Sequence, residues 1–194
     1  MKKFFLVLSL LLSSVSLIAQ TVSEHLTFKG VPIDGTLNEY VKKMENAGFS
    51  YLGQEDGTAM LQGDFAGYKN CIIGVSTLKA VNVVSTIGVI FPFCEDWSSL
   101  ESNYEGLKSM LTKKYGEPAE VKEEFQGRVQ PRTNNDKIYE LSMDRCTWFT
   151  TFETPKGTIQ LSLQKGEYMK YFVLLKYFDK INTDKVTSSA MDDL

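Results

Sequence analysis

The stretch from Asp96 to Pro118 constrains the fold more than any other, because it predicts one long amphipathic helix between strand-like sequences. Large apolar residues recur in it at steps of three and four, which places them on one face of a helix. They are Trp97, Leu100, Tyr104, Leu107, Leu111 and Tyr115. Ser98 and Glu101 have the spacing of a capping box, and Gly116 is suited to end the helix. An apolar face of this kind needs a covering layer, so we expect the helix to pack on a sheet.

The sequences around this helix follow one order twice. Thr36 and Glu39 predict a capped helix that runs to about Ala47. Alternating apolar residues then predict strands at 49–52, 58–65, 71–78 and 81–91. After the long helix, strands are predicted at 119–126, 138–143, 146–153, 158–164 and 168–178. The predicted fold class is α+β, with two tandem helix-plus-antiparallel-sheet units of about four strands each and the helices packed on one face.

The predicted organisation places the first unit at 20–95, the second at 96–180 and a flexible polar tail at 181–194. A short edge strand is expected at 25–31, before the first helix. A long polar loop at 127–137 has no counterpart in the first half. The order of elements suggests an internal repeat, although no identity between residues supports a duplication.

Residues 1–19 have the pattern of a secretory signal that is removed on export. A lysine pair precedes the apolar run 4–12, and small residues follow as far as Ala19. We favour cleavage after Ala19, where polar sequence begins, although Ser14-Val15-Ser16 fits the rule of small residues better. The apolar run is shorter than the roughly 20 residues of a spanning helix, and no later run approaches that length. The sequence therefore predicts a periplasmic or secreted protein without a transmembrane segment after signal removal.

Charge and cysteine content bound the function further. The chain has 24 acidic and 21 basic residues, and a mildly acidic protein lacks the concentrated basic face that nucleic acid requires. Its three cysteines are too few for a disulfide scaffold. Cys71 alternates with core residues of a strand and reads as buried, whereas Cys94 and Cys146 are the predicted disulfide pair. We expect a monomer or a weak dimer.

A helix on one face of a four-stranded antiparallel sheet, used twice in a secreted chain, resembles the β-lactamase-inhibitor-protein-like architecture. The segments Phe28–Gly35 and Lys114–Pro118 also look like those of uncharacterised exported bacterial α+β proteins. This resemblance implies protein binding rather than catalysis. It assigns a role to no particular residue.

The common catalytic patterns find little support. His25 is the only histidine and sits near the start of the mature chain, where a solvated surface group is the commoner role. Ser162 and Lys165 have the spacing of a penicillin-binding-type pair, but on an alternating strand and its turn they would point apart. The sequence has no glycine-rich phosphate loop, no HExxH, no CxxC and no EF-hand loop. We expect no metal, no cofactor and no enzymatic activity.

The last predicted strand is apolar on both faces, which a half-covered sheet does not need. Tyr171 and Val173 mark one face, while Phe172, Leu174 and Phe178 mark the other. Burial of both faces within the monomer is the simpler explanation. The alternative is a contact site on the face away from the helices.

The leading hypothesis is a non-enzymatic binding module for a protein or an envelope component. It would use this open sheet face or the 127–137 loop, with Trp148 and Phe172 as anchors and Arg132 at the polar rim. One alternative is a small-molecule or lipid carrier with an apolar pocket between helix and sheet. A hydrolase that uses carboxylates such as Asp144 and Glu140 is a third hypothesis.

Overall fold

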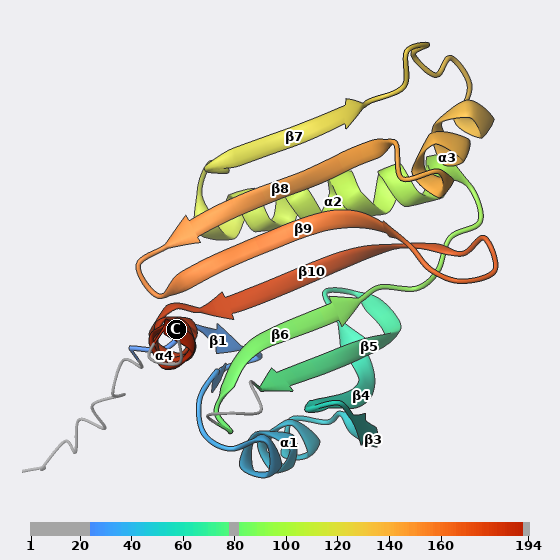
Figure 1. The fold of residues 1–194 in the computed structure, drawn as a ribbon. Coiled ribbons are helices and arrows are strands. Elements are labelled where there is room, and N and C mark those ends of the chain that lie inside the picture. Colours follow the sequence, from blue (N-terminus) through green and yellow to red (C-terminus); the bar gives the residue numbers. More distant parts are fainter. Residues whose placement is uncertain (1–23, 78–81, 192–194) are drawn as a thin grey trace, which may run out of the picture.

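The structure is a computed structural model that describes residues 24–77 and 82–191. The predicted signal sequence and its cleavage site lie outside the described residues. Within these residues the chain forms four helices, a large antiparallel sheet of eight strands and a small two-stranded sheet (Figure 1). The strand order in the large sheet is β3-β4-β5-β6-β10-β9-β8-β7. The predicted α+β class with an antiparallel sheet is therefore confirmed.

The bounds of the elements follow the sequence patterns closely in most places. The strands are β1 (Thr27–Phe28), β2 (Val31–Pro32), β3 (Ser50–Glu55), β4 (Thr58–Phe65), β5 (Tyr68–Thr77), β6 (Val84–Ile90), β7 (Glu120–Phe125), β8 (Cys146–Thr154), β9 (Gly157–Lys165) and β10 (Tyr171–Asp179). The helices are α1 (Leu37–Asn46), α2 (Trp97–Tyr115), α3 (Asn134–Ser142) and α4 (Lys180–Met191).

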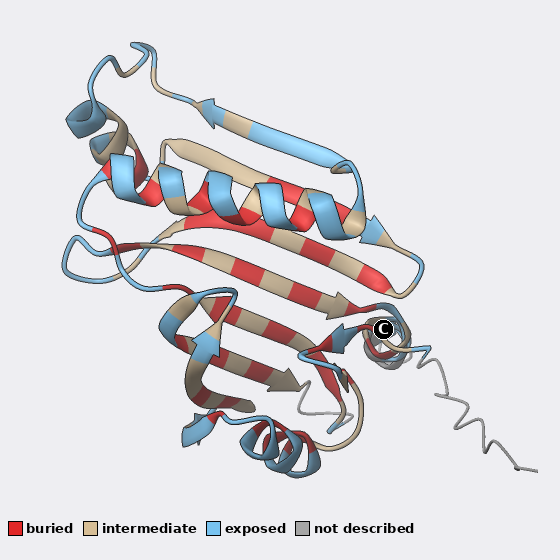
Figure 2. Ribbon diagram, turned by 180° about the vertical axis from the view of Figure 1, so that it is seen from behind, coloured by how far each residue is buried: buried red, intermediate tan, exposed pale blue. Residues whose placement is uncertain are grey.

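One face of the large sheet is covered by helices. Helix α2 contacts β8, β9 and β10, and α1 contacts β3 and β5; Figure 2 shows α2 lying along its strands on one face of the sheet. The predicted apolar face of α2 points to this sheet, and its residues from Trp97 to Leu111 are buried. Along β10 buried residues alternate with partly exposed ones, because successive side chains of a strand point to opposite faces. The core thus lies between the helices and one face.

The helix ends show one confirmed cap and one correction. In α1 the Thr36 hydroxyl accepts from the Glu39 amide, and the Glu39 carboxylate accepts from the Thr36 amide, as predicted. In α2 the cap is Asp96, not Ser98, since the Asp96 carboxylate accepts from the Ser99 amide at 2.9 Å. The Asp96 carboxylate, two residues before Ser98, accepts from a free backbone amide of the first turn, so the helix begins at Trp97.

The predicted strand at 138–143 is wrong, because this segment belongs to α3. Thr133 and Asp136 form a capping box at the start of α3, inside the predicted 127–137 loop. Ile138 and Leu141 then lie three residues apart and pack toward the core. In so short a segment a helical spacing is hard to separate from strand alternation, which explains the wrong prediction.

The predicted flexible tail also differs from the structure, which has α4 at 180–191. Its first turn is held by two buried polar residues, Asp179 and Asn182. The Asp179 carboxylate accepts from the Asn182 amide at 3.0 Å and from the distant Leu26 amide at 2.7 Å. A polar segment of this kind is ordered by partners far away in the sequence, and local composition does not reveal them.

Both halves of the sheet have a helix followed by four strands, with α3 inserted after β7 in the second half. The halves are not separate sheets, because β6 pairs with β10 over five residues from Leu174–Ile90 to Phe178–Thr86. One continuous sheet therefore crosses the boundary predicted at 95–96.

The predicted disulfide between Cys94 and Cys146 is not formed, and all three cysteines are free. Cys94 pairs with Tyr171 at the start of β10, whereas Cys146 begins β8. Two strands, β10 and β9, lie between them. At about 4.8 Å per strand their backbones are about 14 Å apart, far beyond the roughly 7 Å that a disulfide can bridge.

Candidate functional site

The face of the large sheet that points away from α1 and α2, called the open face below, carries the candidate site. One row of paired residues crosses all eight strands on this face, running Ser50, Gln62, Ile72, Ile90, Leu174, Ser162, Phe149 and Lys122. Ile72, Ile90 and Leu174 form its apolar centre and are only partly buried. The apolar residues predicted on both sides of the last strand thus have different surroundings, one set inside the core and one set on the open face.

A group of exposed and partly exposed apolar side chains lies at the end of the sheet where β9 turns into β10. It consists of Phe93, Tyr168, Met169 and Phe172, and we call it the apolar corner. The rings of Phe93 and Phe172 meet edge to face at 5.6 Å, and Lys170 Nζ lies 5.6 Å from the Phe93 ring. Tyr168 is 89% exposed and Met169 is 76% exposed. Phe172 therefore occupies a surface that can contact a partner.

The turn that presents Tyr168 and Met169 is unusual. The Lys170 amide donates to the Glu167 carbonyl at 3.2 Å, and φ is +55° at Tyr168 and +58° at Met169. Positive φ at both central residues is the pattern of a type I′ turn, which strongly favours Asn and Gly. Other residues adopt this conformation at a cost of about 1–2 kcal/mol each. The fold therefore holds two large exposed side chains at positions where small residues would be more stable.

The three predicted binding residues do not form one surface. Trp148 lies on the opposite face from Phe172, where its ring packs 5.2 Å from Trp97 and 5.3 Å from Phe125. Arg132 is exposed in the loop before α3, and its backbone amide donates to Asp136. Sequence alternation shows that Trp148 and Phe149 point to opposite sides, but it does not tell which side the helices cover.

The sheet opens between β8 and β9 next to the apolar corner, and we call this opening the fork. Pairing of β8 with β9 ends at Phe149 and Ser162, although β7 stays paired with β8 as far as Cys146. On the other side β10 stays paired with β9 as far as Lys165. Figure 1 shows β8 and β9 parting toward α3. A hollow of about 230 Å³ lies there, lined by Trp148 and by residues of both strands.

The ionisable groups around the fork are paired, which bears on the hydrolase hypothesis. Asp144 forms an ion pair with Lys165, while Glu140 accepts two hydrogen bonds of 2.9 Å from Arg145. Each carboxylate thus has its own cation, and the two do not converge on one point. Ser162 Oγ accepts from Gln164 Nε2 at 3.0 Å and makes no contact with Lys165 among the described interactions.

The cysteine at the fork is not set up as a nucleophile. Burial, helped by the negative charge of Glu140, raises the pKa of the Cys146 thiol to about 12. Only the thiolate is nucleophilic, so a raised pKa leaves the group protonated near neutral pH.

A second polar cluster joins the two ends of the described chain. His25 Nδ1 lies 2.9 Å from the Asp179 carboxylate, and Asn182 Nδ2 donates to the carbonyls of Ile33 and Val84 at 3.0 Å. Asp179 and Asn182 are fully buried, and their partners come from four separate segments. Closed inside the protein in this way, the cluster serves to hold segments together and offers a substrate no access to Asp179.

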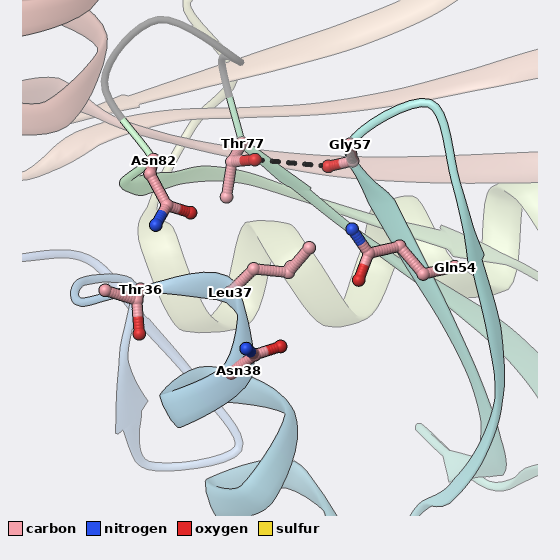
Figure 3. A pocket seen from close by; sticks show the side chains of 7 residues that line it. All are labelled: Thr36, Leu37, Asn38, Gln54, Gly57, Thr77 and Asn82. Carbon is pink, nitrogen blue, oxygen red and sulfur yellow. Dashed lines mark hydrogen bonds between the residues drawn. The ribbon is translucent and has the colours of Figure 1, made fainter.

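The larger recess beside the start of α1 is polar (Figure 3). It has a volume of about 590 Å³ and is lined by Thr36, Leu37, Asn38, Gln54, Gly57, Thr77 and Asn82. The Thr77 hydroxyl donates to the Gly57 carbonyl at 3.2 Å on its far wall. None of these described lining residues is ionisable at neutral pH, so they offer no acid or base for catalysis.

No protein-family model, no curated protein and no solved structure matches the chain. Among the described residues, no group of three or more His, Cys, Asp or Glu side chains is placed to hold a metal ion. No helix in the described ranges combines the length and apolar character needed to cross a membrane. The candidate site is therefore defined by its geometry, namely the apolar corner and the adjoining fork.

Proposed function

We propose that this chain is a non-enzymatic binding module that recognises a protein partner through the apolar corner. The observation that carries the proposal is the turn at Tyr168 and Met169. Two large side chains are held mostly exposed on a backbone conformation that disfavours them. Strained residues that persist in a fold are often part of its function. Within the described chain these side chains bury little, so their benefit lies in a contact made outside it.

The chemistry of the corner fits a protein surface. Aromatic residues and Met are enriched at the centres of protein interfaces, with charged groups at the rim. Lys170 lies at the Phe93 ring, and Glu167 begins the turn, so both charge signs border the apolar group. A rim with both charge signs favours a protein partner. Binding to an anionic membrane surface would instead favour positive charge alone.

The expectations from the sequence extend this proposal. Export to the periplasm or beyond would bring the corner into contact with secreted or envelope partners. We also propose that the two halves of the sheet are tandem units of the β-lactamase-inhibitor-protein-like kind, which is supported by their common order of a helix followed by four strands. The space between the helices and the sheet is filled by buried side chains, which gives the carrier alternative no support.

The test is a selection of random nonapeptides from a display library on the immobilised chain without its predicted signal. We expect peptides that bind at least about tenfold more weakly to the double variant Tyr168→Asn/Met169→Gly. This variant suits the turn, so it should remain folded. Met110→Ala removes an exposed Met on α2 and should leave binding unchanged. Peptides that bind the double variant as tightly as the original chain would show that the apolar corner is not the site.

A further inference from the structure

We infer that the fork between β8 and β9 receives one extended backbone segment of the partner, which pairs with both strands at once. This inference rests on the proposed function and names how the same partner is held. The evidence is the pairing of the strands, the chemistry of the hollow and its position beside the apolar corner.

The first argument is that β8 and β9 are each paired with an outer neighbour at the fork but not with each other. Residues 146–148 of β8 are paired with β7, and residues 163–165 of β9 are paired with β10, but the two segments are not paired with each other. In an antiparallel sheet the amides and carbonyls of a strand point alternately to its two neighbours. Both sides of the fork therefore present backbone donors and acceptors toward the gap. A third strand placed between them would pair with both.

The second argument is the chemistry of the hollow. Its open-face side chains include Thr147, Ser162 and Gln164, which are polar and uncharged, and the charge of Lys165 is already matched by Asp144. An occupant therefore needs hydrogen-bonding groups but no net charge, as a peptide backbone has. A volume of about 230 Å³ is smaller than the roughly 300–1,000 Å³ of sites that enclose drug-sized molecules. It suits a short stretch of chain.

The position of the fork links it to the apolar corner. Gln164 on the β9 side stands opposite Phe172 in the ladder with β10. Beyond Lys165 the same strand leads directly into the turn with Tyr168 and Met169. A segment lying in the fork would thus leave it beside these side chains. Backbone pairing supplies affinity in such strand addition, and nearby side chains supply selectivity.

The test uses a peptide selected on the original chain and a scan in which each of its amides is N-methylated in turn. N-methylation removes one donor at a time. In the fork, alternate amides pair with β8 and with β9, so methylation at consecutive central positions should each weaken binding at least about tenfold. Sensitivity at every second position only would indicate pairing at a single sheet edge and would overturn the inference. Insensitivity at all positions would indicate docking by side chains alone and would overturn it too.

A pair of variants on β9 locates the pairing. Gln164→Trp places a large ring at the fork, and we expect peptide binding to fall at least about tenfold. Thr158→Trp places the same ring on the same face of β9 away from the fork, and binding should change less than about twofold. If Gln164→Trp fails to fold, the N-methylation scan on the original chain tests by itself whether the peptide pairs with both strands. A selection that yields no peptide overturns both the proposed function and this inference, whereas binding that ignores methylation overturns the inference alone.

Discussion

The two faces of the large sheet are made by the same strands, yet their residues have different surroundings. Leu174 and Leu175 are neighbours on β10; Leu175 points into the helix layer and is 1% exposed, whereas Leu174 lies on the open face and stays partly exposed. Apolar side chains alone therefore do not indicate a core position. The helix face supplies the stability of the fold, whereas apolar groups on the open face stay partly exposed.

The sharpest test of this comparison is the matched pair Leu175→Ala and Leu174→Ala. We expect Leu175→Ala to lower the free energy of unfolding by about 2–5 kcal/mol, because it leaves a cavity in the core. Leu174→Ala should cost about 1 kcal/mol or less, because its site is open to water. Chemical denaturation of both variants measures the difference. Equal losses would mean that the open face is covered in the free protein.

A second pair compares thiols on the two faces at neighbouring positions of β8. With a pKa of about 12, Cys146 at pH 8 has about a thousandfold less thiolate than a thiol with the ordinary pKa of 9. We expect Cys146 to react with iodoacetamide about a thousandfold more slowly than a small-molecule thiol. In the variant Thr147→Cys the new thiol lies on the open face and should be alkylated far faster, as mass spectrometry would show. Comparable rates at 146 and 147 would contradict the assignment of faces.

The third prediction concerns the buried cluster at the edge of the helix layer. Asp179→Ala removes the acceptor of the Leu26 and Asn182 amides, and we expect a loss of about 3 kcal/mol in stability. Asp184→Ala removes an exposed carboxylate of α4 and is the control, which should change stability by less than about 0.5 kcal/mol. Thermal unfolding of the two variants measures both stability changes. A small effect at Asp179 would mean that α4 is held by other contacts.

The fourth prediction is a gain in stability at the turn between β9 and β10. Tyr168→Asn/Met169→Gly replaces strained residues with those that a type I′ turn favours, so we expect stability to rise by about 2 kcal/mol. Single variants should each give part of the gain. Urea unfolding measures it. A loss of stability would show that these side chains contribute to the fold and would remove the main support for the binding proposal.

Local patterns were enough to predict the features that depend on neighbouring residues. The periodicity from Trp97 to Tyr115 predicted α2 and its buried face, and the Thr36–Glu39 pair predicted the start of α1. Where several signals compete in a short segment, prediction was weaker. Ile138 and Leu141 fit either a strand or a helix, and the capping box at Thr133 was the signal that could have decided for α3.

The features that depend on distant pairing could not be predicted. The Cys94–Cys146 distance follows from two strands that lie between them, and the buried state of Asp179 follows from its contact with Leu26. Which of Trp148 and Phe149 faces the helices, and where β8 and β9 part, depend on the register of the whole sheet. The apolar residues on both faces of the last strand draw attention to Phe172, whereas the turn at Tyr168 and Met169 has no sequence signal for positive φ.

The place of β10 has a consequence for how the protein is made. It is the last of the ten described strands in sequence, yet it lies in the middle of the sheet between β6 and β9. During synthesis the earlier strands must therefore wait, with β6 and β9 both lacking a neighbour, until residues 171–179 leave the ribosome. Contacts between remote parts of a chain slow folding and leave strand edges open to wrong partners. Efficient production of this protein thus depends on keeping those edges unpaired until its final strand arrives.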